Sequence, residues 1–86
     1  MFYVYIIKSE RLGTLYIGYS TDLQRRLEQH NSGTSEYTKH RGPWRLVYYE
    51  AFTSEADART RELALKDFGR AYGQLKRRIS HSLEDT

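Results

Sequence analysis

Two runs of β-branched and aromatic residues near the start of the chain constrain its fold more than any other feature. The runs cover residues 2–8 and 15–19, and the short segment between them is polar and contains a glycine. This pattern is typical of a β-hairpin. Because alternate residues of a strand point to opposite faces, we expect Tyr3, Tyr5 and Tyr16 to share one face of the hairpin.

The rest of the chain predicts helices that alternate with one more strand. We expect a helix from Asp22 to His30, a long basic loop over residues 34–45, a strand over 46–52, a helix from Ser54 to Gly69, and a last helix with Tyr72, Leu75 and Ile79 on its apolar face. The predicted fold is α/β, in the order ββαβαα, with a small three-stranded, mainly antiparallel sheet flanked by helices. Residues 1–80 are expected to form a single domain with one core, and residues 81–86 a frayed C-terminal tail.

Composition excludes several classes of protein. The 86 residues include no cysteine, which rules out disulfides, thiolate metal sites and a cysteine nucleophile. The longest apolar run, residues 4–7, is far shorter than the ~20 residues that cross a bilayer. The first residues do not resemble a signal peptide, so a cytoplasmic location is expected. The net charge of +3 alone is weak evidence for a nucleic-acid partner.

Several side chains could carry chemistry, and each also has a purely structural interpretation. Tyr5 and Tyr16 could exchange protons, although strand tyrosines usually only pack. Arg26 and His30 share one side of the first predicted helix, where a solvated face is the simpler reading. Glu62 could bind a hard cation through carboxylate oxygen, or only pair with a lysine one turn later.

The predicted loop and the residues after it are basic. Lys39, Arg41 and Arg45 surround Trp44 without an acidic residue among them, which suits contact with phosphates and bases. The alternative is a solvated loop with Trp44 buried in the core. The C-terminal half adds further arginines and lysines, which could form a second basic flank.

The order of these signals is more specific than any one of them. The chain reads Tyr3-Val4-Tyr5, ten residues, Tyr16-Ile17-Gly18, then Asp22-Leu23, Arg26 and His30, with a glutamate on a later helix. This order resembles the GIY-YIG nuclease superfamily, with a degenerate first half-motif. The later pairs Tyr37-Thr38 and Pro43-Trp44 are similar to its short stand-alone YhbQ-like members, and the resemblance spans residues 2–79.

The resemblance implies a metal-dependent endonuclease that cuts DNA, structure-selective or weakly specific, with repair or recombination as its setting. It implies one Mg²⁺ or Mn²⁺ ion on Glu62, with Glu55 as the alternative ligand in the same helix. The implied catalytic residues are Tyr5, Tyr16, Arg26, His30 and Glu62, and Lys39, Arg41, Trp44 and Arg45 are the candidate nucleic-acid contacts. Which tyrosine is the base, and whether the substrate is DNA or RNA, stay open at this point. Gly18 is expected to let a phosphate or a helix approach closely.

Two other classes of function remain. The chain could be a nucleic-acid-binding module that does not cleave or needs a protein partner, since it has no room for a separate recognition domain. It could also be a domain for protein contacts only, in which case the basic loop would have no role in binding DNA.

Overall fold

The computed structural model describes residues 1–84 and contains three strands and three helices in the predicted order ββαβαα. The elements are β1 (Phe2–Ser9), β2 (Leu15–Ser20), α1 (Leu23–Ser32), β3 (Trp44–Phe52), α2 (Glu55–Lys66) and α3 (Arg70–Arg78). The α/β fold class and the predicted hairpin are confirmed.

The sheet is antiparallel throughout and has the strand order β2-β1-β3. The central strand β1 therefore pairs on both sides: Tyr5 lies opposite Gly18 on β2 and opposite Tyr49 on β3. Because β1 is central, four consecutive residues of it, from Val4 to Ile7, are buried. The side chain of Tyr5 consequently lies deep in the molecule.

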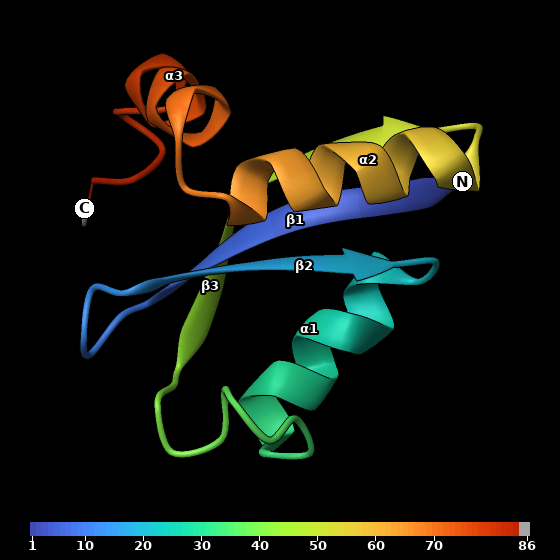
Figure 1. The fold of residues 1–86 in the computed structure, drawn as a ribbon. Coiled ribbons are helices and arrows are strands. Elements are labelled where there is room, and N and C mark those ends of the chain that lie inside the picture. The colour runs from blue at the N-terminus through green and yellow to red at the C-terminus, as the bar shows by residue number, and fades with distance from the viewer. Residues whose placement is uncertain (85–86) are drawn as a thin grey trace.

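Helices cover both faces of the sheet, with α2 and α3 on one side and α1 on the other (Figure 1). The first cluster contains Val4, Ile6, Ile17, Ala58, Leu65 and Leu75, and the second contains Tyr5, Ile7 and Trp44 with Leu23 and Leu27 of α1 packed against it. The single predicted core is thus two clusters separated by one sheet. Alternation along β1 explains the division, since successive side chains point to opposite faces.

Caps fix the ends of the helices that frame the site. The Asp22 side chain accepts a hydrogen bond from the backbone N–H of Arg25, and Gly33 ends α1 in the left-handed conformation with φ 83°. Ser54 accepts from the N–H of Asp57 at the start of α2. This helix ends at Lys66, earlier than predicted, and Phe68 just beyond it has a left-handed φ of 57° that α-helix does not allow.

The predicted tail is partly described. Residues 81–84 lie beside β3, where the guanidinium of Arg45 donates to the carbonyl oxygens of Ser82 and Glu84, both at 3.1 Å. Residues 85–86 lie outside the described residues. Over residues 1–84, none of the helices has the length and apolar character needed to cross a membrane.

Candidate functional site

Tyr5 lies at the centre of the candidate site and is almost fully buried, with 1% of its surface exposed. Its ring lies directly over Gly18: a Cβ atom at that position would be 2.3 Å from both the Cζ and the hydroxyl oxygen of Tyr5. The close approach that we expected at Gly18 is therefore made by the Tyr5 ring, and not by a phosphate or a helix. Gly18 allows the hydroxyl of Tyr5 to reach across β2.

The hydroxyl of Tyr5 meets His30, which projects from the last turn of α1. The hydroxyl oxygen lies 2.7 Å from Nε2 of His30, and Nδ1 of the same ring lies 2.7 Å from Oγ1 of Thr38. His30 and Thr38 are both 1% exposed. Tyr5, His30 and Thr38 thus form a buried hydrogen-bonded chain that links the sheet, the helix and the following loop.

His30 is a neutral imidazole at pH 7. Burial, and next the positive charge of Arg26, lower its pKa from 6.5 to about 4. A neutral ring has one N–H, so it can accept from Tyr5 and donate to Thr38, or do the reverse. Either arrangement gives both ring nitrogens a hydrogen-bond partner. A change from one arrangement to the other transfers one proton along the hydrogen-bonded series of Tyr5, His30 and Thr38.

Tyr5 is a protonated phenol at pH 7. Burial raises its pKa to about 12, and the negative charge of Glu62 acts in the same direction while Arg26 opposes it. Because a phenol with this pKa is protonated at pH 7, Tyr5 is a poor general base. It can still donate its own proton to His30 while it accepts another. The geometry therefore favours Tyr5 as a proton relay.

Tyr16 is the more accessible of the two site tyrosines. Its ring centroid lies 5.1 Å from that of His30, in an edge-on contact, and 6.5 Å from that of Tyr5. On its other side it stacks on Tyr37 at 5.4 Å. The guanidinium of Arg41 lies 4.6 Å from the centroid of Tyr37, which is 50% exposed.

The stack of Tyr16, Tyr37 and Arg41 was not predicted as part of the site. In the sequence, Tyr37 was noted only because the pair Tyr37-Thr38 also occurs in similar proteins. That observation does not indicate which residues Tyr37 contacts. Its place depends on how the loop after α1 folds back over β2. An exposed aromatic ring beside a cation is a surface on which a nucleic-acid base can stack.

Arg26 and Glu62 act on the tyrosine centre from two different helices. Arg26 projects from α1, where Nη1 donates to Oε1 of Gln29 at 3.0 Å, and its charge influences both Tyr5 and His30. Glu62 is buried on α2, and its charge reaches Tyr5. The alternative ligand Glu55 instead accepts from the hydroxyl of Tyr19 at 2.9 Å.

The carboxylate of Glu62 is one hard oxygen donor group that could bind a cation. Among residues 1–84, histidine, aspartate and glutamate nowhere gather in threes as a ready-made metal cage. Mg²⁺ accepts such a site because it keeps several of its waters and needs only one or two carboxylates. The oxygens of Glu62 contact Lys66 Nζ at 2.9 Å and Arg59 Nη1 at 3.4 Å. A bound cation would have to replace the contacts with Lys66 and Arg59. If it does, the Glu62 carboxylate is a suitable ligand for Mg²⁺.

The four predicted nucleic-acid contacts do not form one surface. Trp44 is 3% exposed and its Nε1 donates to the carbonyl oxygen of Thr38, so the indole packs under the site and cannot meet a base. Its expected role is corrected to that of a core residue. Arg45 holds the C-terminal segment, and Lys39 pairs with Glu36 at 3.3 Å. Of the three basic residues, Arg41 reaches the tyrosine centre through Tyr37, which stacks on Tyr16.

Comparison with known proteins gives consistent results. The family described as GIY-YIG catalytic domain matches residues 1–80. A UPF0213 protein of Staphylococcus saprophyticus is 44% identical over 69 residues, which cover 79% of this chain and 83% of that protein. A UPF0213 protein of Halobacterium salinarum is 43% identical over 72 residues, covering 83% and 92%. The solution NMR structure of the UPF0213 protein BH0048 from Bacillus halodurans superposes with a TM-score of 0.53 at 40% identity, covering 87% of this chain and 81% of that one.

Proposed function

The chain belongs to the GIY-YIG catalytic domain family, a nuclease family, and from this premise we propose that it is a metal-dependent endonuclease for DNA. The observation that carries the proposal is the convergence of Tyr16, Arg26 and Glu62 on the buried hydrogen bond between Tyr5 and His30. The proposed nuclease domain covers residues 1–80. A structure-selective or weakly specific activity, a setting in repair or recombination and a cytoplasmic location stay predictions.

Each residue has a proposed role in the hydrolysis. The guanidinium of Arg26 contacts the non-bridging oxygens of the scissile phosphate, for which its planar donor geometry is suited. The hydroxyl of Tyr16, the accessible phenol, orients the attacking water. As the water oxygen bonds to phosphorus and the bond from phosphorus to the leaving oxygen breaks, the water gives a proton to the hydroxyl oxygen of Tyr5. Tyr5 in turn gives its own proton to Nε2 of His30, which can accept it because the ring is neutral at pH 7. Thr38 holds the ring by its other nitrogen.

A cation would be held by Glu62. The carboxylate would provide one ligand, and water would complete the shell of a Mg²⁺ or Mn²⁺ ion. When bound, the ion supplies neutralisation of phosphate charge and stabilisation of the leaving oxygen. With the ion absent, Lys66 and Arg59 keep the carboxylate in place.

Cleavage of labelled branched, flapped, single-stranded and duplex DNA, and of matched RNA, with Mg²⁺ or Mn²⁺ tests the proposal. We expect Glu62→Gln and Arg26→Gln each to lower the rate roughly 100-fold or more, since each removes charge stabilisation of the transition state. The matched control is Glu55→Gln on the same helix, which should cut like wild type. The proposal fails if the wild type cuts none of these substrates, or if both site variants cut as well as it does.

The pairing of Glu62 with two cations favours a second candidate function. A carboxylate already neutralised by Lys66 and Arg59 resists metal binding, and the chain would then bind nucleic acid without cutting it. Salt-dependent retention of DNA with no metal-dependent cleavage on any substrate would support this alternative.

A further inference from the structure

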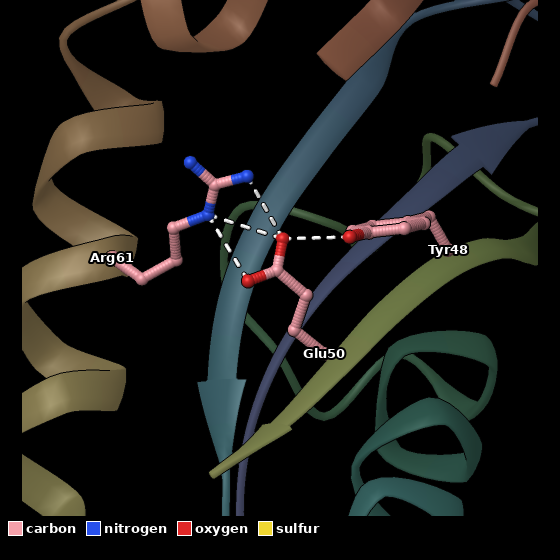
Figure 2. Close-up of polar contacts among 3 residues, drawn as sticks. All are labelled: Tyr48, Glu50 and Arg61. Atoms are coloured by element: carbon pink, nitrogen blue, oxygen red, sulfur yellow. Dashed lines mark hydrogen bonds and ion pairs between the residues drawn. The ribbon is translucent and has the colours of Figure 1, made fainter. Parts of the chain in front are cut away.

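A partly buried network joins β3 to α2 on the face of the sheet away from His30 (Figure 2). Arg61 donates from Nε to both oxygens of Glu50 at 3.1 Å and from Nη2 to Oε2 at 2.9 Å. The hydroxyl of Tyr48 donates to the same Oε2 at 2.6 Å. Burial works against ionisation of Glu50, but the bonds from Arg61 and Tyr48 outweigh it and lower its pKa. The carboxylate is therefore charged at pH 7 and fixes the arginine.

The network leaves one edge of Arg61 available. Nε and Nη2 face Glu50, whereas the third guanidinium nitrogen, Nη1, points away from the carboxylate in Figure 2. An arginine that is fixed in this way loses little conformational entropy when it binds a second anion. The free edge is thus a preorganised donor.

Arg61 also lines a cavity of about 570 Å³ between α2 and α3. The lining residues are Arg61, Ala71, Gln74, Leu75, Arg77 and Arg78. Within residues 1–84, neither Arg77 nor Arg78 takes part in an ion pair. The charge of Arg78 also reaches Glu50. Three arginines line the cavity and Glu50 offsets one positive charge, so the cavity keeps an excess of positive charge.

We propose that this cavity is a second phosphate-binding site, which holds a backbone phosphate of nucleic acid away from the cleavage centre. Guanidinium groups bind phosphate oxygens through paired hydrogen bonds, and Gln74 adds a neutral donor. The site lies on the α2–α3 face, whereas Tyr5 and His30 lie on the α1 face. Glu62, the proposed cation ligand, follows Arg61 on α2, so the separation applies to the Tyr5–His30 pair. A strand that reaches from the cavity to that pair must pass around an edge of the sheet, which favours bent or branched substrates over straight duplex.

The phosphate chemistry stands on the cavity alone, whereas the nucleic-acid source rests on the proposed function. A free phosphate compound would use the same donors. The experiment therefore needs one arm for a strand and one for inorganic phosphate.

The first arm measures DNA affinity against salt concentration for Arg77→Gln/Arg78→Gln. The matched control is Arg70→Gln/Lys76→Gln, which removes the same charge from the same helix but outside the cavity. We expect the cavity variant to bind single-stranded and branched DNA about tenfold more weakly, with a salt slope on single-stranded DNA reduced by roughly 0.7, as one lost phosphate contact requires. The control should stay within about threefold of wild type. Single-turnover cleavage at saturating protein should not change in the control variant.

The second arm titrates inorganic phosphate into ¹⁵N-labelled protein and follows the Nε–H signals of the arginines. Shifts at Arg61, Arg77 and Arg78 that vanish in the cavity variant support the site, even if the wild type fails to bind DNA, in which case the source is a free phosphate compound. Equal DNA affinity of the cavity and control variants, together with no phosphate shifts at these three residues, overturns the inference. Failure of the proposed function alone would show as phosphate binding without DNA cleavage.

Discussion

Gly18 and Tyr5 form one packing unit, and the smallest substitution at Gly18 tests it. A Cβ in Gly18→Ala would overlap the Tyr5 ring at 2.3 Å, and the neighbouring atoms belong to a buried, rigid ring. We expect the variant to lose about 1–3 kcal/mol of unfolding free energy, the usual cost of overpacking. It should also lose cleavage activity, because Tyr5 must move away from His30. Urea denaturation measures the first effect and a cleavage assay the second.

A double-mutant cycle provides the control for Gly18. Leucine lacks the Cζ and hydroxyl atoms that the new methyl group would meet, so Tyr5→Leu should relieve the overlap. The two substitutions are therefore expected to be less destabilising together than their sum, by about 0.5–3 kcal/mol. Additive effects would show that the Gly18 backbone has another role.

The buried imidazole of His30 predicts how stability changes with pH. Its pKa is about 4 in the folded chain and 6.5 in an unfolded one, so the unfolded chain binds more protons between these values. The contribution of His30 to stability is thus complete above about pH 6.5 and falls as the pH drops towards 4, by at most about 1.4 kcal/mol per pH unit. Urea denaturation between these pH values, in wild type and His30→Gln, measures it.

Carboxylates also titrate in this range, so the informative quantity is the difference between the two proteins. We expect a shallower slope of unfolding free energy against pH in His30→Gln than in wild type. His40→Asn, a change at an exposed histidine with a left-handed φ of 69°, should keep the wild-type slope. Identical slopes for all three proteins would mean that His30 is protonated at the same pH in both states.

Among the elements, the loop between α1 and β3 is joined at its ends by two hydrogen bonds of one amide side chain. Asn31 donates from Nδ2 to the carbonyl oxygen of Trp44 at 3.0 Å and accepts from its N–H through Oδ1 at 2.7 Å. The amide thereby acts as a short strand partner for the first residue of β3. It also fixes the loop that carries Thr38 and Tyr37 to the site.

Asn31→Ala removes both hydrogen bonds. We expect a loss of about 1–2 kcal/mol of unfolding free energy. Each lost hydrogen bond costs about 1 kcal/mol, and the better helix propensity of alanine offsets a small part of this cost. The NMR signals of Thr38 should broaden as the loop loosens. Ser32→Ala, in the same turn, is the control and should change stability by no more than about 0.5 kcal/mol. Equal stability of the two variants would argue against the role of Asn31.

Local patterns predicted the elements, and long-range contacts account for the differences. Alternation and capping residues encode the hairpin and the starts of α1 and α2, which the structure confirms. β3 begins at Trp44, two residues before the predicted start, because its backbone pairs with Asn31 and Ser9. Those partners are distant in sequence, so no local pattern at Trp44 indicates them.

The candidate site follows the same division. The spacing of Tyr5 and Tyr16 and the place of Arg26 and His30 on one helix were visible in the sequence, and the structure brings these groups together. The stacking of Tyr37 and the network of Tyr48, Glu50 and Arg61 were not visible. Both depend on strand register and loop closure, which join residues that no periodic pattern relates.

The molecule as a whole is organised by β1, which contributes to the hydrophobic clusters on both faces of the sheet. Val4 and Ile6 belong to the α2–α3 side, and Tyr5 and Ile7 to the α1 side. Neither side can open without exposing apolar residues of the shared strand. We therefore expect the cleavage centre and the arginine cavity to be lost in one cooperative transition.

Leu65→Ala tests this cooperativity. Leu65 is fully buried in the cluster on the α2–α3 side, whereas Trp44, the one tryptophan, lies on the α1 side. The substitution should cost about 2–5 kcal/mol. If the two faces unfold together, the fluorescence of Trp44 and the far-ultraviolet circular dichroism will shift to lower urea by the same amount. Leu63→Ala, at a 69% exposed position of the same helix, should leave both midpoints near wild type. A fluorescence midpoint that stays in place while the dichroism midpoint falls would show that the α1 face keeps its structure independently, with the tyrosine centre intact.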